Sequence, residues 1–185
     1  MTNKETLIKR INGGDNPVFR ELYGTQPAEL AREAQRYLAL LGQFEKAFGT
    51  ADVLFFTSPG RTEIGGNHTD HNYGRVLAGA VNLDNVAVAS PNQTDIIRIQ
   101  SEGYPEFEVN LASLSPDKSE QFSSAALVRG VCARMKELGF RIGGFNACID
   151  GGVPKGSGLS SSASFEVLIG AIVNALFNDG KMDPI

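Results

Sequence analysis

The sequence predicts an α+β fold in which a mixed β-sheet is covered by helices. Apolar residues recur at helical spacing through the first fifty residues, and the period changes to short apolar runs from Asp52 onward. Two later segments again have helical length. Strands and helices that mix without regular alternation favour an α+β sheet over a doubly wound one.

Composition places the chain among globular proteins of ordinary domain size. Of its 185 residues, 42% are hydrophobic and 21% are charged, and the net charge is −4. The mildly acidic balance argues against nucleic acid as a partner, because phosphate backbones require basic patches. No apolar run reaches membrane-spanning length, and the polar N-terminus lacks a signal-peptide core. Cys132 and Cys148 form no metal or redox motif, so we expect reduced core thiols of a cytoplasmic protein.

Two helices are expected in the N-terminal segment. Asp15-Asn16-Pro17 is a capping sequence with proline at the first helical position, and Gly24 ends that helix. The next helix starts around Thr25 to Glu29 and is closed by Gly49. Its charged residues are interpreted as a solvated face: Glu29, Arg32, Glu33 and Arg36.

The middle of the chain is expected to form strands. Val53 to Phe56 is a short apolar run typical of a buried strand, and Pro59-Gly60 should break it into a polar loop that lasts to Gly74. Further expected strands are Arg75 to Leu83, Asn85 to Ser90, Ile96 to Gln100, Glu106 to Asn110 and Gly144 to Asp150. Helices are expected at Gln121 to Leu138 and at Phe165 to Phe177.

A glycine- and serine-rich segment, Gly151 to Ala163, joins the last expected strand to the last helix. Glycines let a ligand approach the backbone, and the free amides of a helix start suit an anion, so the segment could hold phosphate. It is not a Walker loop, since Lys155 comes too early, and Ser161 stands where a dinucleotide fingerprint has its third glycine. An ordinary helix start with good N-cap residues remains the alternative.

The polar stretch Ser58 to Gly74 contains both histidines of the chain. His68, Asp70 and His71 could ligate a metal, although a structural zinc site wants four ligands. The stretch could equally be a solvated hairpin loop. In a third interpretation, its carboxylate, imidazole and amide groups bind the hydroxyls of a sugar, and Arg61 lies where negative charge develops.

Two motifs together resemble a known family. Pro59-Gly60-Arg61, Asn67-His68-Thr69-Asp70 and Gly74-Arg75-Val76-Leu77 resemble the galactokinase signature. Pro154 to Ala163 is similar to the ATP-binding motif of the GHMP kinase superfamily. The resemblance implies that residues 1–185 form a GHMP-kinase N-terminal domain (ribosomal S5 domain 2-like), with residues 1–50 as a helical segment within it. The C-terminal domain would be absent, and we expect the chain to be a fragment.

The resemblance also implies roles for individual residues. Arg61 would stabilise the transition state of phosphoryl transfer from ATP to the anomeric hydroxyl of galactose. The sugar would contact Asn67, His68, Thr69 and Asp70. The ATP phosphates would contact Gly156, Ser157, Gly158, Leu159, Ser160, Ser161 and Ser162, with Ser162 also helping to hold Mg²⁺.

Departures from the family pattern leave alternatives open. Asn67 replaces the glutamate that binds the sugar's 6-hydroxyl, His71 replaces a tyrosine, and Glu63 stands where the family often has asparagine. Another sugar (N-acetylgalactosamine, arabinose or a uronic acid) is therefore an alternative substrate, and a non-catalytic galactose sensor is an alternative function. The family's catalytic aspartate and acidic Mg²⁺ ligand would lie beyond residue 185, so we expect this chain alone to be inactive. Its oligomeric state is not predicted.

Overall fold

The computed structural model describes residues 4–13, 16–66, 73–101 and 103–182. Its strands are β1 (Leu54–Gly65), β2 (Leu77–Pro91), β3 (Ile96–Ser101), β4 (Phe107–Asn110) and β5 (Phe145–Gly151). Its helices are α1 (Lys4–Asn12), α2 (Pro17–Tyr23), α3 (Pro27–Phe48), α4 (Ser124–Glu137) and α5 (Ser161–Phe177), with a short 3-10 turn at Lys118–Glu120.

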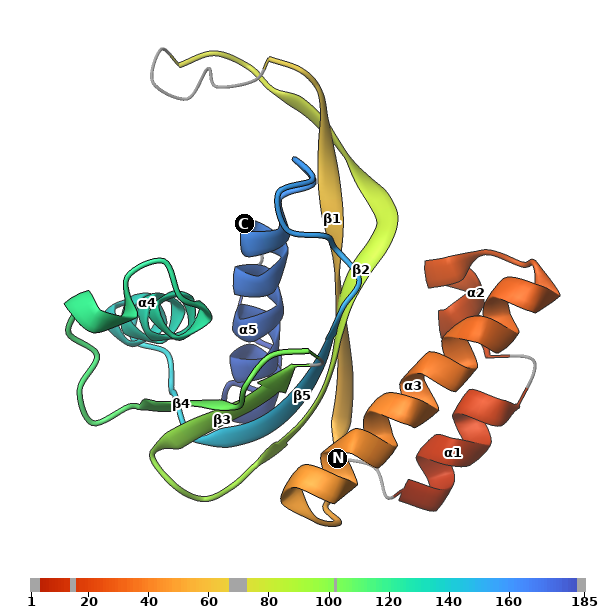
Figure 1. Cartoon of the computed structure of the whole chain (residues 1–185), viewed down its shortest axis with the longest axis horizontal. Helices are drawn as coiled ribbons and strands as arrows, with labels where there is room; N and C mark the ends of the chain where they lie inside the picture. Colours follow the sequence, from red (N-terminus) through yellow and green to blue (C-terminus); the bar gives the residue numbers. More distant parts are fainter. Residues whose placement is uncertain (1–3, 14–15, 67–72, 102, 183–185) are drawn as a thin grey trace.

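The described strands form one five-stranded mixed sheet in the order β1-β2-β5-β3-β4. β3 and β5 run parallel, and the other neighbours are antiparallel. Helices cover both faces, with α4 and α5 on one side and α3 on the other, where α1 and α2 pack against it (Figure 1). The predicted α+β fold is confirmed.

Strand β2 lies between two hydrophobic clusters and contributes residues to both. Ala87 and Ala89 pack in the cluster under α4 and α5, whereas Val86 and Val88 pack in the cluster under α3. Successive side chains of a strand point to opposite faces, so a strand buried on both faces needs a continuous apolar run. This double burial explains the sequence Val86 to Ala89.

The expected break at Pro59-Gly60 is wrong. Strand β1 continues through both residues to Gly65, and a register shift between Pro59 and Arg61 accommodates them. β1 is an edge strand of the described sheet, and an edge position tolerates a proline because one side of the strand has no ladder partner. The expected division of the next segment into two strands is also wrong, since β2 is continuous.

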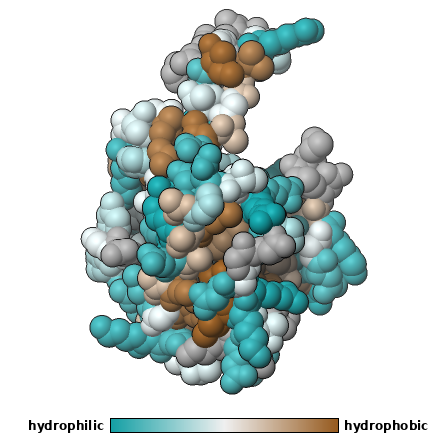
Figure 2. All heavy atoms as spheres, turned by 90° about the vertical axis from the view of Figure 1, so that its right-hand side faces the viewer, coloured by the Kyte–Doolittle hydropathy of each residue, from teal (hydrophilic) through white to brown (hydrophobic). Residues whose placement is uncertain are grey.

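Beyond the body of the molecule, β1 and β2 form a long two-stranded ribbon (Figure 1). Figure 2 shows this ribbon standing out from the rest of the surface, with apolar side chains on it. Among its described residues, Ile64, Tyr73, Val76 and Leu77 are exposed large hydrophobic residues. Residues 58–65 of the polar stretch thus belong to β1 and are strand rather than loop.

The helix ends follow the sequence signals closely. The Asn16 side chain accepts from the amides of Val18 (3.1 Å) and Phe19 (3.4 Å), and Gly24 and Gly49 end α2 and α3 with positive φ. α4 begins at Ser124, three residues later than expected, because Ser123 caps it. None of the described helices is both long enough and apolar enough to span a membrane.

The solvated-face interpretation is wrong for two residues of α3. Glu33 is buried and Arg36 is mostly buried, whereas Glu29 and Arg32 are exposed as expected. Both buried side chains find partners of opposite charge, which offset the cost of removing them from water. Cys132 and Cys148 are buried and free, as expected.

Candidate active site

The glycine-rich segment forms a compact loop between β5 and α5. Gly156 (φ 73°) and Gly158 (φ 75°) adopt left-handed conformations that other residues reach only with strain. The Ser157 hydroxyl donates to the carbonyl of Pro154 (2.7 Å) and accepts from the amide of Leu159 (3.3 Å). The loop thus has a defined shape of its own.

Helix α5 starts at Ser161, four residues earlier than expected, so Ser161 and Ser162 belong to its first turn. Ser160 is the N-cap, but its backbone is left-handed (φ 59°, ψ 45°), and within the described residues its side chain makes no capping hydrogen bond. An ordinary serine cap accepts from an amide of the first turn. The ordinary-cap alternative is therefore disfavoured, and the first-turn amides stay available to an anion.

Arg61 lies directly beside this loop. Its backbone N–H donates to the carbonyl of Leu159 (3.0 Å), and a Cβ atom at Gly60 would come within 2.9 Å of the same carbonyl oxygen. The Arg61 side chain is half exposed, and its Nη2 lies 3.0 Å from Oε1 of Glu63. The fold thus places the Arg61 backbone against the glycine-rich loop and leaves the guanidinium accessible.

The expected sugar-binding residues Asn67, His68, Thr69 and Asp70 lie outside the described residues, as does the alternative metal ligand His71. In the described ranges, no three His, Cys, Asp or Glu side chains are grouped closely enough to hold a metal ion.

A second contact fastens the tip of the loop. The Lys155 ammonium lies over the ring of Tyr104, 4.4 Å from its centroid, in the turn between β3 and β4. Such a cation–π contact contributes about 0.5–1 kcal/mol at exposed sites. Lys155 is therefore directed toward this turn.

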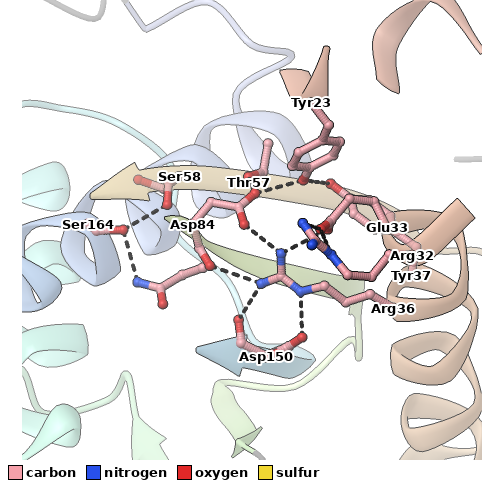
Figure 3. A network of polar contacts seen from close by, with 11 residues as sticks. Tyr23, Arg32, Glu33, Arg36, Tyr37, Thr57, Ser58, Asp84, Asp150 and Ser164 are labelled. Atoms are coloured by element: carbon pink, nitrogen blue, oxygen red, sulfur yellow. Dashed lines mark hydrogen bonds and ion pairs between the residues drawn. The ribbon is translucent and has the colours of Figure 1, made fainter. Parts of the chain in front are cut away.

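The sequence did not predict a polar network beneath the loop, centred on Arg36 (Figure 3). The guanidinium donates to Asp84 Oδ1 (2.6 Å) and Asp150 Oδ2 (2.6 Å), and to the main-chain oxygen of Asp84 (2.9 Å). Asp84 also accepts from the hydroxyls of Tyr23 (2.7 Å) and Thr57. The network joins α2 and α3 to three neighbouring strands.

Burial and charge shift the pKa values of this network. Burial by itself lowers the pKa of Arg36, but its hydrogen bonds to Asp84 and Asp150 raise it above the ordinary value, so the guanidinium stays charged. Burial raises the pKa of Tyr37, which hydrogen-bonds Tyr23, to about 12. Arg36 and Tyr37 therefore both keep their protons near neutral pH.

The network also fixes the start of the glycine-rich loop. The amide of Gly152 donates to the carbonyl of Asp84 (3.0 Å), and a side chain at Gly152 would collide with that oxygen and with Arg36 Nη2. Asp84 and Asp150, which are the charged residues of strands β2 and β5, were the available sequence signal. Their shared partner was not visible, since Arg36 lies on a distant helix.

Comparison with known proteins gives two family matches. The galactokinase galactose-binding signature matches residues 42–91, and the GHMP kinases N terminal domain matches residues 126–184. The first range includes Arg61, and the second includes the whole glycine-rich loop.

Among curated relatives, the galactokinase of Clostridium tetani is 33% identical over 144 residues, which are 77% of this chain and 36% of that protein. The galactokinase of Streptococcus suis is 38% identical over 147 residues, covering 77% of this chain and 35% of that protein. The chain thus spans about a third of the length of the relatives that it matches.

Solved structures agree with these matches. Lactococcus lactis galactokinase complexed with galactose superposes with a TM-score of 0.72 at 33% identity, over 77% of this chain and 38% of that one. Methanococcus jannaschii mevalonate kinase superposes with a TM-score of 0.55 at 19% identity, over 68% of this chain and 40% of that one. The second likeness concerns the fold alone.

Proposed function

We propose, from the premise that this chain corresponds to the N-terminal portion of a galactokinase in the GHMP kinase superfamily, that the whole protein phosphorylates galactose. It would transfer the γ-phosphoryl group of ATP to the anomeric hydroxyl and form galactose 1-phosphate. The observation that supports this most directly is the hydrogen bond from the Arg61 amide to the Leu159 carbonyl. It brings the two motifs, far apart in sequence, into contact.

The ATP phosphates are assigned to residues Gly156 to Ser162. Left-handed glycines turn the backbone around an anion, and the first-turn amides of α5, including those of Ser161 and Ser162, have no intrahelical acceptor. The uncapped state of these amides is what an anion-binding helix start requires. Catalysis of this kind rests mainly on positioning and charge stabilisation.

Arg61 is assigned to the charge that develops on the transferring phosphoryl group. Its fixed guanidinium fork suits phosphate oxygens, and its half-exposed position leaves the group accessible. Glu63 holds the guanidinium in this position. The anion would then share or replace this partner.

Mg²⁺ is assigned to Ser162, whose exposed side chain lies on the first turn of α5. A single hydroxyl fits this ion, because Mg²⁺ usually combines few protein oxygens with phosphate oxygens and water. When bound, it would neutralise part of the phosphate charge.

The sugar is assigned to Asn67, His68, Thr69 and Asp70, which fall within the matched galactose-binding signature. Asn67 is uncharged, so another sugar remains the second candidate substrate. Residues 1–185 are proposed to form the N-terminal domain, with residues 1–50 as its helical segment. The free, buried thiols of Cys132 and Cys148 agree with a cytoplasmic protein.

The test is a sugar panel assayed with the whole protein and ATP–Mg²⁺, following ADP release and the position of the new phosphate by NMR. We expect phosphorylation of galactose at C1, and a loss of about 10²–10³-fold in kcat for Arg61→Ala. Arg98→Ala is the matched control, because Arg98 on β3 is another partly exposed arginine, paired with the carboxylate of Glu108 on β4. It should keep the wild-type rate.

Other outcomes would contradict the proposal in distinct ways. Phosphorylation of only a different sugar would refute galactose as substrate. Galactose binding without turnover would favour the sensor function. Equal rates for Arg61→Ala and Arg98→Ala would remove Arg61 from the mechanism.

A further inference from the structure

A pair of buried polar side chains joins β1, β2 and α5 on the sheet face opposite to Arg36. The Ser164 hydroxyl donates to the carbonyl of Ser58 (2.8 Å) and accepts from Nδ2 of Asn85 (2.9 Å). Ser164, Asn85 and Ser58 are all buried, and Figure 3 shows Ser164 linked to Ser58. Because both of these hydrogen bonds join buried protein groups, they constrain the relative position of the three elements.

The pair lies next to the positions where β1 and β5 lead into the candidate site. Asn85 is the register partner of Ser58 on β1 and of Gly151 on β5. Gly151 opens the glycine-rich segment, and Arg61 follows Ser58 by three residues. Asn85 therefore pairs, through the backbone ladder, with the residues from which both functional segments depart.

The Ser164–Ser58 hydrogen bond is one of two that attach the start of α5 and the residue before its cap to β1. On the loop side of Ser160, the Leu159 carbonyl accepts from the Arg61 amide (3.0 Å). On the helix side, Ser164 holds the Ser58 carbonyl. The segment between Leu159 and Ser164 is thus attached to β1 at both ends, and it contains Ser160, Ser161 and Ser162.

We propose that Ser164 and Asn85 are positioning residues, which hold Arg61 and the first turn of α5 at the relative position that phosphoryl transfer requires. The inference rests on the proposed function of that site. Neither side chain would touch the substrates, since both are buried under the strands. Misplacement of a reacting group by about 1 Å costs on the order of 10²-fold in rate, so a loosened fastening should lower kcat.

The kinetic test compares Ser164→Ala with Ser90→Ala in the whole protein. Ser90 is similarly buried on β2 but lies at the end of the strand away from the loop, where its hydroxyl makes a long contact (3.5 Å) to the Pro91 carbonyl. We expect Ser164→Ala to lower kcat about 10-fold or more with little change in KM for sugar, whereas Ser90→Ala keeps the wild-type kcat. Asn85→Ala should also lower kcat, and the double variant should lose no more than Ser164→Ala alone, because Asn85 acts through its hydrogen bond to Ser164.

A second readout does not depend on turnover. Hydrogen–deuterium exchange at the Arg61 amide, which donates to Leu159, should accelerate about 10-fold or more in Ser164→Ala and remain unchanged in Ser90→Ala. Wild-type kcat and unchanged Arg61 exchange in Ser164→Ala would overturn the positioning role. If the wild-type protein phosphorylates no sugar, the proposed function fails, and the exchange experiment alone decides whether the fastening exists.

Discussion

Replacing Arg36 by methionine should destabilise the fold strongly, because it leaves buried carboxylates without their cation. The guanidinium makes two bonds of 2.6 Å, to Asp84 and Asp150, and one of 2.9 Å to the Asp84 carbonyl. Methionine fills a similar volume, so the main change is the lost charge and its hydrogen bonds. Removing one partner of a buried ion pair costs about 3–5 kcal/mol.

The surroundings set the loss near the lower end of this range. Asp84 keeps two hydroxyl donors, from Tyr23 and Thr57, and the 28% exposed side chain of Asp150 can regain water. We therefore expect a loss of about 3 kcal/mol. With a urea m-value of about 1–3 kcal/mol/M, the unfolding midpoint should fall by about 1–3 M.

The assay is urea unfolding followed by circular dichroism, with Arg32→Met as the matched control. Arg32 lies one turn earlier on the same helix and also pairs with Glu33, but its side chain is 68% exposed. Exposed ion pairs contribute about 0–1 kcal/mol, so the control should change the midpoint little. Equal midpoints for the two variants, with unchanged m-values, would refute the structural argument.

Two further predictions concern Tyr37 and Ser160. Burial raises the pKa of Tyr37 to about 12, so the folded state keeps its proton while the unfolded state loses it. The free energy of unfolding should therefore fall as pH rises from about 10 to about 12, by up to about 1.4 kcal/mol per pH unit, and it should fall less steeply in Tyr37→Phe. Denaturant titrations at several pH values measure both slopes, and equal slopes for the wild type and Tyr37→Phe would contradict the prediction. Ser160→Ala should lower the free energy of unfolding by less than about 0.5 kcal/mol, measured by thermal unfolding, because Ser160 makes no capping bond; loss of a working cap would cost about 1 kcal/mol. The same variant should weaken ATP binding. A loss of about 1 kcal/mol in stability with unchanged ATP affinity would argue against the phosphate role.

Local signals predicted the elements whose boundaries depend on nearby residues. Asn16 caps the start of α2, and Gly24 and Gly49 cap the ends of α2 and α3, as expected, since capping involves residues within one turn. The expected strands Ile96 to Gln100 and Glu106 to Asn110 are also confirmed, each to within one residue, as β3 and β4. The contact between Arg61 and the glycine-rich loop could be anticipated only from the family resemblance.

The features that the sequence did not predict depend on contacts between residues far apart in the chain. Arg36 binds Asp84 at a separation of 48 residues and Asp150 at 114, so its surroundings do not appear in the helical period of α3. Pro59 stays in a strand because β2 pairs with it and the other edge of β1 is unpaired in the described sheet. In each case, tertiary packing overrode a correct local preference.

The polar groups beneath the candidate site include two consecutive residues of β2, Asp84 and Asn85. On the α3 face, Asp84 binds Arg36, and on the α5 face, Asn85 binds Ser164. From Val86 to Ala89, β2 is apolar and buried on both faces. Apolar contacts stabilise without fixing direction, whereas hydrogen bonds fix both distance and direction. The sheet therefore uses apolar packing where only stability is needed, and polar contacts where the glycine-rich loop and the Arg61 strand must keep one relative position.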